Sequence, residues 1–235
     1  VSGSPLPLTD GVIGPDGALY FLTGGRRLES DLYRVYYGGN LDEKDHTPTV
    51  ETPEHKIRIE LEAYHHGPKA GAVDFAWPYL KHNDRFIRYA ARIAIEHQPV
   101  KEWQEKTLAE KDPVTLTLAS LSLARQGNAS VQPQLLHAVA GIDFSKLSES
   151  QQIDVVRTFE VIIARMGIPD AVGKAAVINY LNAQYPAKNN EINRLLAKVL
   201  LYLDAPEAVS KTMALMANAK DDNSSGQKTL MESSD

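Results

Sequence analysis

The chain has 235 residues, of which 43% are hydrophobic and 23% charged, proportions typical of a globular protein. Its 25 basic and 30 acidic residues are interspersed and give a formal charge of −5, which argues against nucleic acid or an anionic membrane surface as a partner. The absence of cysteine excludes disulfides, thiolate metal ligands, cysteine nucleophiles and haem attachment through C-x-x-C-H within this segment. No apolar run approaches the roughly 20 residues that span a bilayer, so we expect a soluble chain without membrane insertion.

Residues 1–38 carry the pattern of a small antiparallel sheet. The segment Gly14-Pro15-Asp16-Gly17 is typical of a turn, and Gly24-Gly25 predicts a second one. The stretches 18–23 and 31–37 are rich in aromatic and β-branched residues, as strands are. We therefore expect two or three strands, which need a neighbouring surface because so small a sheet is marginally stable alone.

A linker and a series of helices follow. Residues 39–50 are polar and rich in turn formers, which predicts the linker. Thr52-Pro53-Glu54 then marks a helix start, with an N-cap followed by proline at the first helical position. Apolar periodicity and punctuation by proline, glycine and asparagine predict helices at 52–65, 69–80, 84–97, 100–110, 113–126, 131–140, 148–166, 169–183, 190–203 and 206–218.

The spacing of these helices predicts the fold class. Two helices with their loops form a unit of ~35–40 residues, the period of helical-repeat proteins. We predict a mainly α fold in which residues 51–219 form an α-solenoid, an α/α superhelix, after the short β segment. An irregular globular bundle of the same helices is the alternative. Residues 220–235 are predicted to be a polar tail, and we expect the chain to be a piece of a longer protein.

The segment 83–94 resembles the second-helix signature of HEAT repeats. Asp84 stands at the helix start, where it can cap the helix, and Arg88 follows one turn later. Small and aliphatic residues then form a stripe that allows a neighbouring helix to approach closely: Ile87, Ala90, Ala91 and Ala94. An ordinary amphipathic helix with an aspartate cap is the simpler interpretation.

A wider resemblance covers most of the chain. Segments 5–10, 13–21, 23–27 and 32–35 resemble the closing blade of a β-propeller of the sorbosone or glucose dehydrogenase-like type. Together with 84–96, 193–196 and 202–206 they resemble large bacterial proteins in which such a propeller precedes HEAT, or armadillo-like, repeats and a cytochrome c-like domain. The resemblance implies an exported, periplasmic or extracellular protein that oxidises sugars or polyols, with pyrroloquinoline quinone or haem c as cofactor of the full-length protein.

This segment itself contains no residues to which the family's cofactor sites can be assigned. We therefore expect a non-catalytic scaffold that docks other domains of the same protein or a partner protein. One alternative is that the strands, near Asp10 or Arg26, complete the active site of a quinone-dependent dehydrogenase that lies mostly outside the chain. The other is an extracellular module that binds polysaccharide or protein.

Arginines are the candidate interaction residues. Arg88 and Arg92 share a helix face, and in a solenoid the inner helix faces are the natural docking surface. Arg26 and Arg27 follow two glycines and could hold an anion, although a solvated hairpin turn is the favoured interpretation.

Histidines and aromatic residues are weaker candidates. The seven histidines show no spacing typical of metal ligands, and adjacent His65 and His66 point in different directions on a helix. Several aromatic residues fit core packing better than a recognition groove for peptide or glycan: Phe75, Trp77, Tyr79, Tyr89 and Trp103.

Overall fold

The computed structural model describes residues 7–25, 28–39 and 52–218. The chain divides into two compact units, Val1–Val50 and Glu51–Asp235. Arg26, Arg27, nearly all of the expected linker at 39–50 and the expected polar tail at 220–235 lie outside the described residues. Among the described residues the fold is mainly helical, with a small antiparallel sheet near the N-terminus, as the sequence predicted.

The first unit contains three strands in the order β1-β2-β3, each antiparallel to its neighbour. They are β1 (Leu8–Ile13), β2 (Leu19–Gly25) and β3 (Leu28–Val35). The predicted turn joins β1 to β2, where Gly17 has a φ of +74° that glycine adopts without steric cost. Strand β3 begins at Leu28 rather than near residue 31, because Leu28 still pairs with Gly25 across the ladder.

The sheet has little core of its own. Among the described residues of this unit, Ala18 and Thr23 are buried, and the rings of Phe21 and Tyr33 stack at 4.9 Å. Large apolar side chains on both faces stay exposed: Leu8, Val12, Ile13, Leu32, Tyr36 and Tyr37.

The second unit contains ten α-helices among its described residues. They are α1 (Pro53–Glu62), α2 (Ala72–Ala76), α3 (Arg85–Glu96), α4 (Gln104–Ala109), α5 (Pro113–Gln126), α6 (Gln132–Ala140), α7 (Glu149–Met166), α8 (Ala171–Asn182), α9 (Asn190–Tyr202) and α10 (Ala208–Ala217). Short 3₁₀ segments precede or follow several of them: η2 (Trp77–Lys81), η3 (Val100–Glu102), η4 (Ala129–Val131) and η5 (Phe144–Lys146).

Side-chain caps explain several helix starts. Thr52 accepts a hydrogen bond from the His55 amide, Asp84 from that of Phe86, and Asp112 from that of Thr115. Proline follows Thr52 and Asp112 at the first helical position, where its missing N–H has no helical partner to lose. Each cap contributes about 1 kcal/mol. The predicted starts of α1, α3 and α5 are confirmed to within one residue.

Two predicted helices are shorter than expected. The helix expected at 69–80 is α2 followed by η2, because Pro78 removes an amide donor and crowds the preceding turn. The helix expected at 100–110 is η3 followed by α4, and the backbone leaves helical geometry at Trp103, where φ is −133°. Both segments still occupy the predicted places in the helix order.

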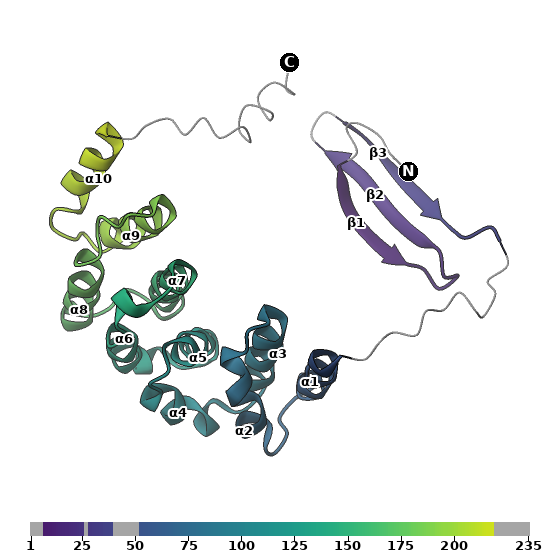
Figure 1. Cartoon of the computed structure of the whole chain (residues 1–235), viewed down its shortest axis with the longest axis horizontal. Helices are drawn as coiled ribbons and strands as arrows, with labels where there is room; N and C mark the ends of the chain where they lie inside the picture. The colour runs from purple at the N-terminus through teal and green to yellow at the C-terminus, as the bar shows by residue number, and fades with distance from the viewer. Residues whose placement is uncertain (1–6, 26–27, 40–51, 219–235) are drawn as a thin grey trace. The chain divides into compact units, whose positions relative to one another are not determined.

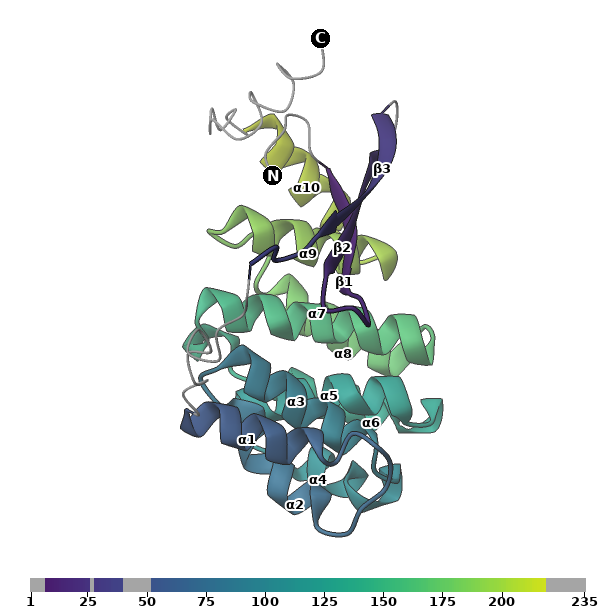
Figure 2. The ribbon, with the colours of Figure 1, turned by 90° about the vertical axis from the view of Figure 1, so that its right-hand side faces the viewer.

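Successive odd-numbered helices pack side by side. Contacts join α1 to α3, α3 to α5, α5 to α7 and α7 to α9, and this series is the first row. A second row contains α4, α6 and α8, with contacts from α4 to α6 and from α6 to α8. Figure 1 shows the first row on the inner side of a curve within this unit, and Figure 2 shows the helices stacked along it.

One continuous apolar core lies between the rows. Leu123, Phe159 and Leu196 come from three first-row helices and are fully buried. Burial of a side chain of this size stabilises a fold by about 1.5–3 kcal/mol. The core therefore fixes the first-row helices in position and leaves their outward faces to form a surface of defined shape.

Candidate functional site

Helix α3 has two chemically different faces. Its small-residue stripe is buried as predicted, with Ile87, Ala90, Ala91 and Ala94 at most 3% exposed. The other face carries Arg85, Arg88, Tyr89 and Arg92, of which Tyr89 is 58% exposed. The tight packing of one face therefore holds the cations of the other in fixed places.

These side chains form one wall of a groove of about 470 Å³ that we call the inner groove. Its floor and opposite wall come from α5, α7 and the turn before α7. The apolar lining residues are Pro113, Val114, Leu118, Leu121, Leu147 and Val155, and the polar ones include Lys81, Thr117, Ser150, Gln151 and Asp154. The structure thus brings the predicted Arg88 and Arg92 together in one concavity across three first-row helices.

Arg88 anchors the loop before α3. Its Nη1 donates to the carbonyl oxygen of His82 at 2.7 Å and to that of Asn83 at 2.9 Å. The Asp84 carboxylate accepts a hydrogen bond from the Phe86 amide at 2.7 Å, so it caps the helix as predicted. The hydrogen bonds of the Arg88 guanidinium thus go to carbonyl oxygens rather than to a carboxylate.

Arg92 belongs to an ion-pair network that joins α3 to α5. Its Nη1 lies 3.0 Å from Glu96 Oε1, and Arg125 Nε lies 3.2 Å from Glu96 Oε2. The Glu96 side chain is 5% exposed, so two cations compensate one buried carboxylate. Arg92 also lies over the Tyr89 ring, with Cζ 5.1 Å from its centroid. Arg92 is therefore mainly a structural cation of the groove wall.

Arg85 has the fewest partners among these cations. It forms no hydrogen bond or ion pair with another described residue, and its guanidinium lies over the Phe86 ring at 4.7 Å. Phe86 is itself 54% exposed. An exposed arginine beside exposed aromatic rings can bind carboxylates and apolar groups together.

Asp154 is the one carboxylate among the lining residues of the inner groove. The residue is exposed, yet partial desolvation by its neighbours raises its pKa, and the Arg157 and Arg88 guanidinium groups act in the opposite direction without cancelling the effect. The one carboxylate that lines the groove thus lies on α7, opposite the three arginines of α3.

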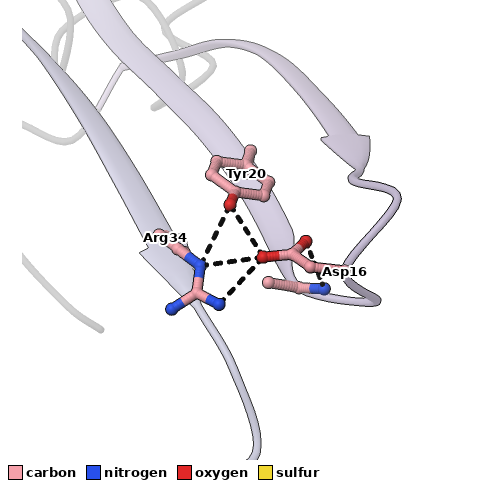
Figure 3. Close-up of polar contacts among 4 residues, drawn as sticks. Asp16, Tyr20 and Arg34 are labelled. Carbon is pink, nitrogen blue, oxygen red and sulfur yellow. Dashed lines mark hydrogen bonds and ion pairs between the residues drawn. The ribbon is translucent and has the colours of Figure 1, made fainter.

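A second polar cluster lies on the sheet, and the sequence did not predict it. Asp16 Oδ2 accepts hydrogen bonds from Tyr20 Oη at 2.9 Å and from Arg34 Nη2 at 2.8 Å, as Figure 3 shows. These bonds, with that of Arg34 first, lower the pKa of Asp16 to about 2. The hairpin register pairs Tyr20 with Arg34, so the signal was available once the strands were aligned.

This cluster joins the turn before β2 to strands β2 and β3 at an exposed surface. Asp10, the acidic candidate on the sheet, accepts a hydrogen bond from the next amide at 2.8 Å. Arg26 and Arg27 lie outside the described residues. The structure therefore assembles no group of candidate residues around Asp10.

Most aromatic candidates are core residues, as favoured from the sequence. Trp103 is fully buried, and Trp77 is 8% exposed and donates its indole N–H to Glu110 at 2.8 Å. Phe75 and Tyr79 pack against the core. Tyr89 is the exception, since it lines the inner groove.

The histidines have structural partners or lie apart. His65 Nε2 is 2.8 Å from the Ala90 carbonyl oxygen, which links the end of α1 to α3. Among the described residues, no three histidine or acidic side chains converge as metal ligands do. No helix in the described part of the chain is long and apolar enough to cross a membrane.

Comparison of the chain with protein-family models, with curated proteins and with solved structures finds no match. The resemblance to HEAT repeats and to propeller dehydrogenases therefore stays a prediction. Any functional argument has to start from the inner groove itself.

Proposed function

We propose that the helical unit is a HEAT-like α-solenoid that acts as a docking scaffold for a polypeptide segment. The serial contacts of first-row helices, with second-row helices packed against α5, α7 and α9, support the solenoid assignment. In such folds the inner helix faces present an extended binding surface.

The observation that carries the proposal is the chemistry of the inner groove. Its floor is aliphatic, while guanidinium groups and an exposed tyrosine line one wall. Aliphatic floors take apolar side chains, and arginine and tyrosine are prominent in the energetically important parts of protein interfaces. The lining side chains come mostly from helices fixed by the core, so docking requires little reorganisation.

We propose further that the unit serves a larger exported protein. The resemblance to propeller dehydrogenases supports a place between an oxidising domain and a haem c domain, with any quinone or haem site outside this chain. The three strands would then belong to the propeller, which would cover their exposed apolar residues. This context is separable from the docking function, which depends on the helical unit alone.

Site-specific photo-crosslinking tests the docking function. A photoreactive phenylalanine analogue replaces Tyr89 in the inner groove of the full-length protein, expressed in the cells that make it. As a control, the same analogue replaces Val172, which is 79% exposed on α8 in the second row. We expect position 89 to crosslink to one defined polypeptide segment, identified by mass spectrometry, and position 172 not to do so. Equal labelling at both positions, or no polypeptide at position 89, would contradict the proposal.

A further inference from the structure

The inner groove adjoins a second cavity. A second cavity of about 1080 Å³, which we call the edge cavity, is lined by α4, α6, η5 and the loop between α4 and α5. Four residues line both spaces: Pro113, Val114, Leu147 and Gln151. The two concavities therefore meet over the starts of α5 and α7, with Val114 and Leu147 as an apolar junction.

The two spaces carry opposite charge. The inner groove is lined by Lys81, Arg85, Arg88 and Arg92 against the single carboxylate of Asp154. Arg92 pairs with Glu96, and Lys81 Nζ lies 3.5 Å from Asp112 Oδ2 of the edge cavity, so Arg85 and Arg88 carry the uncompensated positive charge. The edge cavity is lined by four carboxylates against two lysines and a histidine: Glu105, Glu110, Asp112, Asp143, Lys111, Lys146 and His137. A continuous surface whose charge changes from positive to negative along its length favours a ligand that carries charges of the opposite sign in the same order.

The acidic side stays charged under ordinary conditions. Burial acts to raise the pKa of Glu110, but hydrogen bonds from the Asp112 amide, the Trp77 indole and the Lys111 amide outweigh it and lower the pKa. Hydrogen bonds from Ser145 and Lys146 lower the pKa of Asp143. Glu105 is exposed, and the Gln104 amide is its one hydrogen-bond donor among the described residues, at 3.2 Å. Glu105 is thus the most available carboxylate for a ligand cation.

We infer that the inner groove and the edge cavity together bind one extended segment of a partner protein, with acidic residues at one end, an apolar residue in the middle and basic residues at the other. The acidic end lies against α3, close to Arg85. The apolar side chain lies on Val114 and Leu147, and the basic end faces Glu105. This inference deepens the proposed docking function and depends on it.

Synthetic peptides test the charge order. Fluorescence anisotropy measures binding of three labelled probes to the whole chain: acidic–apolar–basic, basic–apolar–acidic, and a uniformly basic peptide of equal length. Because a peptide can lie in either chain direction, we expect at least one bipolar probe to bind about tenfold or more tighter than the basic one. Its binding should weaken as the salt concentration is raised, because dissolved ions screen interactions between exposed charges, with a Debye length of about 10 Å at 0.1 M.

Single charge changes assign the two ends. Arg85→Glu should weaken the bipolar probe by about tenfold, whereas Lys101→Glu, an equal change at an exposed residue that lines neither space, should leave it unchanged. Asp154→Asn should tighten binding, a result that misfolding cannot produce. Glu105→Gln should weaken the probe by about threefold, and this effect alone should vanish when the basic residues of the probe are made neutral.

The outcomes separate the inference from the proposed function. Preference for the uniformly basic probe, or equal loss with Arg85→Glu and Lys101→Glu, would overturn the charge order even if position 89 still crosslinks to a partner. If position 89 crosslinks to a partner but none of the three peptides binds, the inference is likewise contradicted and the docking function is not. Failure of the crosslink itself would count against docking.

Discussion

At the scale of single residues, one buried hydroxyl has no compensating partner. Ser120 in α5 is fully buried, and its Oγ has no hydrogen-bond partner among the described residues. Ser122, two positions on, is equally buried but donates to the Leu118 carbonyl oxygen at 3.2 Å. An unpartnered polar group in the core costs free energy that an apolar replacement of similar size recovers.

We therefore expect Ser120→Ala to stabilise the protein by about 1 kcal/mol relative to Ser122→Ala. The comparison matters because serine-to-alanine changes raise helix propensity equally at both positions. Urea denaturation gives the measurement, as a shift in midpoint at unchanged slope. A smaller or reversed difference would show that the Ser120 hydroxyl finds a partner in solution.

A second residue-scale prediction concerns the sheet. Asp16 has a pKa of about 2, with the hydrogen bond from Arg34 as the largest cause and that from Tyr20 as the second. Arg34→Gln should therefore raise the pKa of Asp16 towards its ordinary value of 3.8, and Tyr20→Phe should raise it less. NMR titration of the Asp16 carboxyl carbon measures both shifts. The reverse ranking would mean that the arginine is displaced by solvent.

At the scale of elements, helices were predictable where local chemistry decides them. Prolines and capping residues such as Asp112 mark their starts in the sequence itself, and α5 spans the predicted residues 113–126. The length of α2 was not predictable from apolar periodicity, which continues through Pro78 although the hydrogen bonding changes there. The helices were thus predictable mainly from capping residues and prolines within a few positions of each helix end.

The candidate site was only partly predictable for a related reason. Shared helical spacing placed Arg88 and Arg92 on one face, but the Leu118 and Leu121 floor comes from α5 and depends on which helices pack together. The partner of Arg88 was missed because backbone carbonyls leave no trace in a sequence pattern. Tertiary contacts, rather than any local motif, make the groove.

The buried side chain of Gln98 connects the end of α3 to the loop between α1 and α2, and its contribution to stability can be measured. Gln98 follows α3 and is 3% exposed, and its Oε1 accepts from the Lys69 amide at 2.8 Å between α1 and α2. Gln98→Leu would leave that amide without its partner, so we expect a loss of about 2 kcal/mol in unfolding free energy. Gln104→Leu is the control, because the Gln104 amide donates only to the exposed Glu105 among the described residues. Similar losses in both variants would contradict the assigned role.

At the scale of the whole molecule, two carboxylates with opposite pKa shifts contribute in opposite directions to the pH dependence of stability. Glu110 has a pKa below its ordinary value of 4.5, so it contributes stability above pH 4.5 that is lost as the pH falls through its folded pKa. Asp154 has a pKa above its ordinary value of 3.8, so ionising it opposes folding at higher pH. Ionised Asp154 in the inner groove thus opposes folding of the unit, whereas ionised Glu110 in the edge cavity favours it.

Asp154→Asn should consequently raise the melting temperature at neutral pH by about 1 °C, a small effect because the side chain is partly exposed and screened. The gain should shrink as the pH falls through the folded pKa and disappear below about 3.8. Glu110→Gln should instead lower the melting temperature at neutral pH, with the deficit closing on acidification. Calorimetry across this range measures both, and a pH-independent gain for Asp154→Asn would mean that packing, rather than charge burial, distinguishes the two side chains. A gain of the expected kind would show that the groove retains this acid at a cost in stability, as binding sites often do.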